Sequence, residues 1–465
     1  MNKVIRGDCI EKMRELKENS VDAVVTDPPY ALGFMDKEWD SFTAKEYQDF
    51  CEAWGKEAFR VLKHGGHILA FSGTRTYHRM VVGLEDAGFE VRDMIEWVYG
   101  SGFPKSHNIG KAVDKLQGNE REVVGTEKID IGMQSGSMHS GRSVKIIERD
   151  KTKGTSEWEG WGTALKPAHE PICMARKPLA EKTVAENCVK WGTGGMNIDE
   201  SRVEFTSEYD AQEANNLRYE KSADGGNGGE FNKSKEGVKR NQNFTGRFPA
   251  NLIHDGSDEV RECFPETKGD SPNRKERKGG HREIFVGTEN NQVRNQIISG
   301  VKFTASGNAS RYFKSIFYSA KASKSERNKG CEGLEEKYVT EQNKWTENDY
   351  RKGDGEKTTK PTKNNHPTVK PINLMRYLVR LVTREGQVVL DCFAGSGTTG
   401  CACLVEGREY VLIEKHKRYA DIIIPTRLEY WGNPDNWSDL KEHKLLPNVE
   451  KNRNVELQKW LGDNI

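Results

Sequence analysis

The chain has 465 residues, of which 34% are hydrophobic and 31% are charged, with 72 Lys and Arg against 71 Asp and Glu. This length exceeds the ~100–200 residues of a single domain, so we expect two or three cores. The balanced charge leaves a nucleic-acid partner open, because such binding depends on local patches. The nine cysteines show no CxxC spacing, and the start MNKVIRGDCI has no apolar signal core. We therefore expect a soluble intracellular protein with reduced thiols, no metal site and no membrane partner.

The first hundred residues alternate patterns typical of strands and of helices. Residues 21–26 and 67–71 are short apolar runs, whereas residues 45–62 carry apolar side chains at helical spacing. A second helix is expected at 74–88 and a further strand at 89–99. Repeated strand–helix units predict an α/β fold with a parallel sheet covered by helices.

The rest of the chain divides by composition. Residues 125–162 are rich in Gly, Ser and charge and are predicted to form a mobile surface loop. Periodicity is weak between 183 and 360 and returns at His366. Further elements are expected at 372–383 (helix), 388–390 (strand), 400–406 (helix), 410–413 (strand) and 419–428 (helix). We therefore expect three parts: 1–182, an insert at 183–360, and 361–465.

A glycine turn follows the strand at 388–390. Gly395, Gly397 and Gly400 give a Gly-x-Gly-x-x-Gly pattern between that strand and the next helix. Glycines let a ligand approach the backbone, and the free N–H groups of the helix N-terminus face it. Glu414 ends the following strand and could accept both ribose hydroxyls of an adenosine. A dinucleotide-binding oxidoreductase fits the glycines nearly as well.

Asp391 separates these alternatives, because it lies directly before the glycine turn. A carboxylate there would repel a pyrophosphate but would suit a cationic amino-acid moiety. S-adenosylmethionine has such an ammonium group. The residues therefore favour S-adenosylmethionine over NAD.

A second turn, Asp27-Pro28-Pro29-Tyr30, follows the strand at 21–26. Two prolines fix the backbone and remove two N–H donors, which leaves the Pro28 carbonyl as an acceptor beside the Asp27 carboxylate. Two adjacent acceptors match an exocyclic amino group, and Tyr30 offers a ring for stacking a planar base. Positioning and electrostatics would then activate the amine for attack on a methyl group. No Pro-Cys pair occurs in the chain, so carbon-5 cytosine methylation is not expected.

These segments, in this order, resemble the β-group of amino-directed DNA methyltransferases, which methylate adenine N6 or cytosine N4, and in particular prophage-type enzymes. The resemblance rests on five stretches: 6–10 (RGDCI), 19–22 (NSVD), 27–30 (DPPY), 366–371 (HPTVKP) and 390–399 (LDCFAGSGTT). It implies a Rossmann-like methyltransferase fold with a mostly parallel seven-stranded sheet. It also implies a catalytic half at 1–182, a target recognition region and linker at 183–360, and a cofactor half at 361–465. One departure is Cys392, where the family commonly has proline.

The resemblance assigns roles residue by residue. Asp27, Pro28, Pro29 and Tyr30 would handle the base, with Asp27 also near the cofactor. Asp8 and Cys9 would lie by the adenine of S-adenosylmethionine and Glu414 by its ribose. The methionine part would be surrounded by Asp391, Phe393, Ala394, Gly395, Ser396, Gly397 and Thr398, with Thr368 and Lys370 nearby. His169 and Glu170, in a segment resembling the wall of the base pocket, are more simply interpreted as a hydrogen-bonded structural pair.

The implied partner is double-stranded DNA, from which the target base would be flipped out. Asp at position 27 favours adenine N6, and cytosine N4 is the alternative. An NAD-dependent oxidoreductase and a non-catalytic DNA-binding specificity protein are further alternatives, and both leave the 27–30 turn without a chemical role. A homodimer and a cognate restriction enzyme stay open as partners. The resemblance implies a cytoplasmic protein encoded by a bacterium, an archaeon or a phage.

Overall fold

The computed structural model describes residues 2–32, 42–102, 106–133, 144–205, 211, 246–267, 307–316, 324–336, 363–438 and 440. Two compact units are formed: residues 1–100 together with 169–465, and residues 101–168. Each unit is described by itself. Within the described part of the chain, no helix combines the length and apolarity needed to cross a membrane.

The larger unit is built on one nine-stranded sheet. Its strands lie in the order β1 (Lys3–Arg6), β15 (Glu409–Glu414), β14 (Val388–Asp391), β2 (Val21–Thr26), β3 (Leu62–Phe71), β7 (His169–Arg176), β4 (Glu90–Val98), β10 (Leu252–His254) and β13 (Lys314–Ser315). Neighbouring strands are parallel except for β7, which is antiparallel to both β3 and β4. The predicted α/β fold with a mostly parallel sheet is confirmed. Seven strands were expected, and the two additional short strands, β10 and β13, come from residues 183–360.

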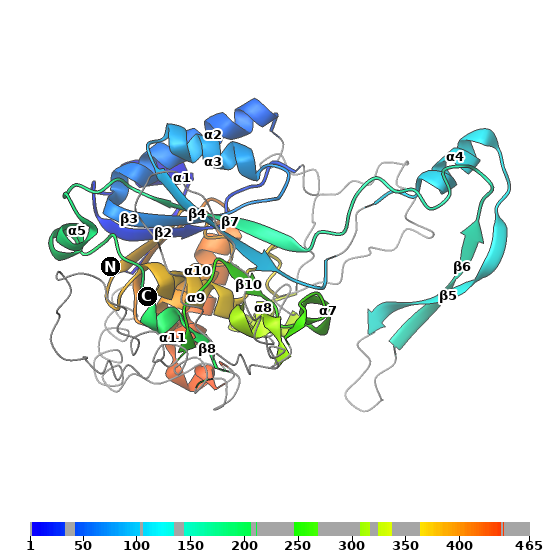
Figure 1. Cartoon of the computed structure of the whole chain (residues 1–465). Helices are drawn as coiled ribbons and strands as arrows, with labels where there is room; N and C mark the ends of the chain where they lie inside the picture. The colour runs from blue at the N-terminus through cyan, green and yellow to red at the C-terminus, as the bar shows by residue number, and fades with distance from the viewer. Residues whose placement is uncertain are drawn as a thin grey trace, which may run out of the picture. The chain divides into compact units, whose positions relative to one another are not determined.

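Helices cover both faces of this sheet (Figure 1). One face packs against α1 (Cys9–Arg14), α2 (Ala44–Val61) and α3 (Tyr77–Asp86), and the other against α9 (Ile372–Val382), α10 (Thr398–Glu406) and α11 (Ile424–Gly432). Successive side chains of a strand point to opposite faces. Val24 accordingly packs in the hydrophobic cluster with α1, α2 and α3, and Val25 packs in the cluster with α9, α10 and α11. This explains why β2 is buried along its whole length and why its apolar residues do not alternate with polar ones.

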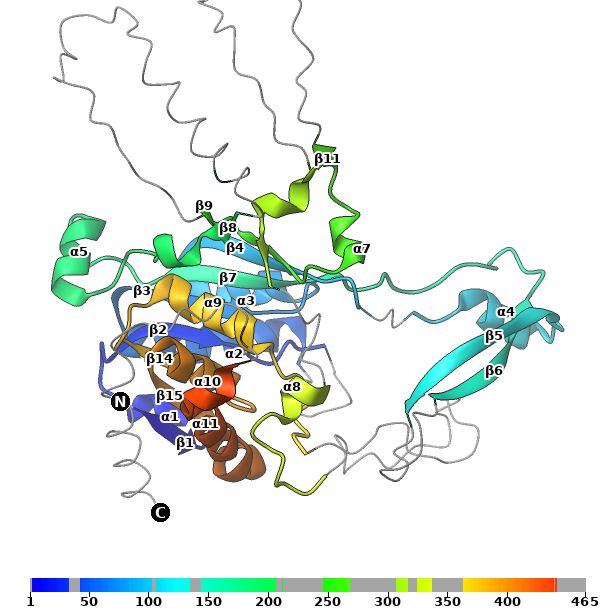
Figure 2. The same ribbon diagram turned by 90° about the horizontal axis from the view of Figure 1, so that it is seen from below.

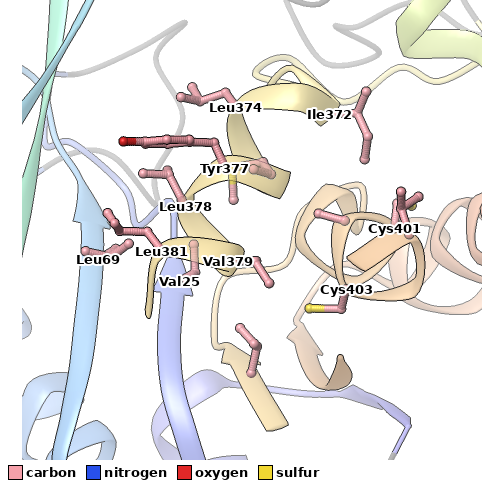
Figure 3. Packing of buried hydrophobic residues seen from close by; sticks show 14 of the residues in the cluster. Val25, Leu69, Ile372, Leu374, Tyr377, Leu378, Val379, Leu381, Cys401 and Cys403 are labelled. Carbon is pink, nitrogen blue, oxygen red and sulfur yellow. The ribbon is translucent and has the colours of Figure 1, made fainter. Parts of the chain in front are cut away.

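Helix α9 fills the second face. Its side chains Leu378, Val379 and Leu381 lie toward the sheet and α10, near Val25 of β2 (Figure 3). Leu378 and Val379 are fully buried. Burial of one such side chain stabilises a fold by about 1.5–3 kcal/mol. The helix is therefore anchored against the centre of the sheet, and residues 366–371 lead directly into it.

The sheet has a topological switch point between β14 and β2. From β14 the chain passes through α10 to β15, and from β2 it passes through α2 to β3, so the two connections cover opposite faces. A crevice forms at the carboxyl ends of strands where connections diverge in this way, and ligands of open α/β sheets bind there. Both sequence motifs begin at this edge.

Residues 183–360 contribute further short elements to the larger unit. In chain order these are α5 (Val184–Trp191), η3 (Asp199–Ser201), β8 (Val203–Glu204), β9 (Gly246–Arg247), α7 (Asp258–Arg261), β11 (Glu266–Thr267), β12 (Gly307–Asn308), η5 (Ala309–Tyr312) and α8 (Lys324–Asn328). After β15, η6 (Tyr419–Ile423) leads into α11, and η7 (Pro434–Trp437) follows. The β8–β9 and β11–β12 pairs are antiparallel.

The smaller unit contains α4 (Ile109–Gln117) and an antiparallel hairpin of β5 (Glu122–Met133) and β6 (Val144–Lys153), which Figure 2 labels. The expectation of a surface loop over 125–162 is therefore wrong for residues 125–133 and 144–153, which are strands, whereas residues 154–162 form turns. Arg121 organises the unit, because its guanidinium pairs with Asp114 and lies 2.8 Å from Glu159 Oε1. The Gly and Ser content suggested a loop, whereas strand pairing decides the structure of this segment.

Candidate active site

The structure brings the two motif segments together at the switch point. Strands β14 and β2 are parallel, with Leu390 opposite Val24. At their carboxyl ends the Thr26 hydroxyl donates to Asp391 Oδ1 at 2.7 Å, although these residues are 365 positions apart in sequence. Asp27 and the glycine turn therefore start from adjacent strand ends, as the sequence motifs required.

Asp27 lies at the centre of a polar cluster. Its Oδ1 accepts a hydrogen bond from the Tyr30 hydroxyl at 2.6 Å, and its Oδ2 accepts one from Lys370 Nζ at 2.7 Å. Lys370 Nζ also lies 3.1 Å from the Tyr30 hydroxyl oxygen and 3.2 Å from Glu170 Oε2. Glu170 Oε2 is in turn 3.3 Å from the Tyr30 hydroxyl. Two carboxylates, one ammonium group and one phenol thus share a small volume, which we call the Asp27 cluster.

Burial and charge set the protonation of this cluster. Burial raises the pKa of Asp27, the Lys370 ammonium opposes that rise, and the Glu170 carboxylate adds to it. Burial alone would lower the pKa of Lys370, but the two carboxylates raise it. Burial also holds the pKa of Tyr30 well above its usual value. Lys370 therefore stays an ammonium and Tyr30 a neutral phenol at neutral pH.

The backbone of the Asp-Pro-Pro-Tyr turn is held by the segment between β3 and α3. The Thr76 hydroxyl, beyond the end of β3, donates to the Tyr30 carbonyl at 2.6 Å. A Cβ atom at Gly73 would lie 3.3 Å from Tyr30 Cδ2, so the glycine allows the ring to approach the backbone closely. Pro28 is buried, and Pro29 is partly exposed. The aromatic ring is therefore fixed beside the carboxylate.

The glycine turn is shaped by close contacts and by positive φ angles. Gly395 has φ 55°, and a Cβ atom there would lie 2.7 Å from His366 Nε2. Gly397 has φ 77° and precedes the first residue of α10. Non-glycine residues rarely adopt such angles. Both positions therefore require glycine, and His366 packs directly against the turn.

Two carboxylates brace this turn. Asp391 accepts hydrogen bonds from Thr26, from Thr399 and from the Phe393 N–H, and burial raises its pKa to about 6. Glu414 accepts hydrogen bonds from the N–H groups of Gly395 at 2.8 Å and His416 at 2.7 Å, and burial raises its pKa to about 7. Both side chains lie at the carboxyl edge of the sheet.

The other predicted cofactor residues occupy neighbouring places. Asp8 caps α1 by accepting the Ile10 N–H at 3.1 Å, and the following Cys9 is buried. The Phe393 ring packs edge-on against the Trp54 ring, with the ring centroids 5.5 Å apart. Ala394, Ser396 and Thr398 are buried in the turn, whereas Thr368 is exposed and donates its N–H to His366 Nδ1. Within the described residues, no group of three or more His, Cys, Asp or Glu could hold a metal ion.

Lys370 contacts Asp27 and Tyr30, and its expected place near the methionine part of the cofactor stays a prediction. One expected placement differs from the structure. The interpretation of His169 and Glu170 as a bonded pair is wrong: His169 Nε2 lies 3.3 Å from Glu96, and Glu170 belongs to the Asp27 cluster. Neighbouring residues of a strand point to opposite faces, so the two side chains diverge.

Sequence reasoning missed the buried Arg427 on α11. Its Nη1 donates to the Ser396 carbonyl at 2.7 Å, to the Ser396 hydroxyl at 2.9 Å and to the Thr398 hydroxyl at 3.0 Å. Arg427 thus holds the glycine turn from the side of α11. Its only sequence signal was an arginine within an apolar helical pattern. That pattern does not show what the side chain contacts.

Comparison with known proteins gives matches to DNA methyltransferases. The chain is 25% identical over 231 residues to Type II methyltransferase M.HindIII of Haemophilus influenzae, which covers 42% of this chain and 64% of the relative. It is 32% identical over 119 residues to Type II methyltransferase M.HpaI of Haemophilus parainfluenzae, covering 24% and 37%. The chain therefore spans less than two thirds of the length of these relatives.

Solved structures of DNA methyltransferases give weak matches. The PvuII DNA methyltransferase, described as cytosine-N4-specific, has a TM-score of 0.39 at 13% identity, covering 99% of this chain and 94% of that one. A complex of M1.HpyAVI with SAM has a TM-score of 0.34 at 15% identity, covering 92% and 100%. These scores are too low to carry an argument.

The match to a family model is extensive. The model N6_N4_Mtase, described as a DNA methylase, matches residues 21–425. This range begins with β2 and ends at the start of α11, so it includes the Asp27 cluster and the glycine turn and stops two residues before Arg427. The chain therefore belongs to the N6/N4 amino-directed family of DNA methylases.

Proposed function

We propose that this protein transfers a methyl group from S-adenosylmethionine to the exocyclic amino group of a base extruded from double-stranded DNA, and that the target is adenine N6. The observation that carries the proposal is the hydrogen bond between Thr26 and Asp391. It joins the strand ends that carry the Asp-Pro-Pro-Tyr turn and the glycine turn. A base-handling group and a cofactor loop then share one crevice at the carboxyl edge of the sheet.

The residues of this edge fit S-adenosylmethionine. The positive φ angles of Gly395 and Gly397 shape a tight turn directly before the N-terminus of α10, where free backbone N–H groups can face a ligand. Glu414 stands at the end of β15, where a carboxylate can accept ribose hydroxyls, and Asp8 and Cys9 follow the adjacent β1. Phe393 and Asp391 would lie by the methionine part, with Asp391 acting through the turn that it braces. When bound, the cofactor supplies an electrophilic methyl group.

The Asp27 cluster would act on the amine. Asp27 is half of an ion pair with Lys370, and each of its oxygens accepts one hydrogen bond within the cluster. A carboxylate oxygen has two lone-pair sites, so acceptor capacity remains for an amine N–H. As the amine nitrogen gains positive charge, the Asp27 carboxylate stabilises that charge and the Pro28 carbonyl adds a second acceptor. Tyr30 would stack on the base.

Adenine is favoured over cytosine by Asp at position 27, since adenine enzymes tend to have Asp there. Cytosine N4 is the alternative, because both bases offer an amino group. Membership of the DNA methylase family sets the oxidoreductase alternative aside. The β-group and prophage-type assignments, the target recognition region at 183–360, a homodimer and a cognate restriction enzyme stay predictions.

The test is methylation of DNA by the purified protein with labelled S-adenosylmethionine. Digestion to nucleosides and mass spectrometry should show N6-methyladenine, and methylation-sensitive sequencing should show its site. The Asp27→Ala variant should bind DNA and cofactor but lose at least about a hundredfold in rate. N4-methylcytosine would correct the base, and unmodified DNA with the wild-type protein would refute the function. Methylation retained in Asp27→Ala would refute the role of Asp27.

A further inference from the structure

Glu170 is a third charged group at the Asp27 cluster, and it reaches the cluster from a different element. It stands near the start of β7, opposite Trp97 of β4. Its side chain is only 17% exposed, and its Oε2 contacts both Lys370 and Tyr30. A carboxylate with so little solvent access is costly unless it is paired. Lys370 lies between this carboxylate and that of Asp27.

The charges of the cluster show what this arrangement does. Lys370 and Asp27 alone would form a neutral pair, in which the ammonium group offsets the carboxylate. With Glu170 ionised as well, the three groups carry a net charge of −1. Interactions between charges are strong in such a buried setting, because solvent screens them little. A net negative cluster suits a reaction in which the neighbouring nitrogen becomes positive.

We propose that Glu170 is a positioning residue for methyl transfer: it shares Lys370 with Asp27 and so leaves the Asp27 carboxylate with uncompensated negative charge beside the substrate amine. The inference rests on the proposed function. Glu170 would act through Lys370 and Asp27 without touching the amine. Tyr30 would keep the geometry, since its hydroxyl is within reach of both carboxylates.

The rate should report on this arrangement through pH, because methyl transfer needs ionised Asp27. The groups that face Asp27 are Lys370, Glu170 and Tyr30, with Asp391 further out. Tyr99 faces Glu170 and Lys370. Glu170 raises the pKa of Asp27 and Lys370 lowers it. Loss of the Glu170 charge should therefore move the acid limb of the rate profile to lower pH. Loss of the Lys370 charge should move it to higher pH.

The experiment measures single-turnover methyl transfer to DNA against pH, with cofactor and DNA saturating. E170Q should lose about 10–100-fold in rate at neutral pH, with its acid limb shifted down by about 0.5–1 unit. K370M should shift the limb upward. E170D keeps the charge and should keep the wild-type limb. The dissociation constants for cofactor and DNA should change by less than about threefold in E170Q.

Glu96→Gln is the matched control, since it removes a neighbouring acid that pairs with His169 outside the Asp27 cluster. Its rate and pH profile should equal those of the wild type. Equal losses in E170Q and E170D with an unshifted acid limb would show a structural role for Glu170 and overturn the inference. So would wild-type rates in E170Q. Absence of DNA methylation by the wild-type protein would instead refute the proposed function.

Discussion

At the scale of single residues, Gly395 shows how tightly the residues of the glycine turn are packed. Its φ of 55° and the nearby His366 ring leave no room for a side chain. Burial lowers the pKa of His366 to about 3, so the ring is neutral and packs without charge against the turn. Any β-carbon at position 395 must displace either the ring or the backbone.

We predict that Gly395→Ala costs about 1–3 kcal/mol of folding stability and weakens cofactor binding at least about tenfold. Urea unfolding and calorimetric titration with S-adenosylmethionine measure the two effects. Gly333→Ala is the control, because a Cβ atom there has no contact within 4 Å. A Gly395→Ala variant that binds cofactor like the control would show that the turn does not hold it.

The residues of the site differ in how far the sequence predicts them. Asp27 and Asp391 each follow a short apolar run, and parallel strands end at one edge, so their proximity could be inferred. Glu170 could not be placed in this way. Its position depends on β7 running antiparallel between β3 and β4, which a local apolar pattern does not show. Lys370 was found by resemblance, which did not show that it pairs with Asp27.

At the scale of elements, α11 supports the glycine turn through one buried arginine. Arg427 is 1% exposed, and a single one of its nitrogens contacts three oxygens of residues 396 and 398. A helix that lies about thirty residues further along the chain than the turn therefore fixes its conformation. The planar guanidinium holds this nitrogen in a fixed position, whereas lysine offers a point charge on a flexible stem.

We predict that Arg427→Lys destabilises the protein by about 2–4 kcal/mol and weakens cofactor binding, because buried acceptors lose their donor. Thermal unfolding with and without S-adenosylmethionine checks both effects. Arg14→Lys is a suitable control, since Arg14 is 66% exposed and forms a surface pair with Glu57. Unchanged unfolding in Arg427→Lys would mean that the turn is held by its own backbone.

Elements with strong periodicity were predicted well, and those decided by pairing were not. The helix expected at 372–383 corresponds to α9, and the strand expected at 89–99 corresponds to β4. The short strands β10 and β13 have two or three residues and gain their stability only from the sheet edge. Such segments carry too few residues for a pattern to appear.

At the scale of the whole molecule, the smaller unit is an insertion between two paired strands. Val98 at the end of β4 pairs with His169 at the start of β7, and the chain between them forms residues 101–168. Ends that already pair can be joined by a short turn without disturbing the sheet. The unit exposes two indole rings, Trp158 at 40% and Trp161 at 58%.

We predict that replacing residues 101–168 by a short Gly-Ser turn leaves the larger unit folded and its cofactor affinity within about twofold, because the sheet, the glycine turn and α11 lie outside the deletion. If the proposed function holds, DNA affinity should fall, because the insertion is joined to Val98 and His169, and the residue after His169 is Glu170 of the Asp27 cluster. Calorimetric titration with S-adenosylmethionine and fluorescence anisotropy with a duplex measure the two affinities.

Replacement of both Trp158 and Trp161 by alanine in the full chain is a milder variant for the same two measurements. Loss of cofactor binding when residues 101–168 are replaced would show that the insertion supports the sheet. Unchanged DNA affinity would leave target recognition to residues 183–360.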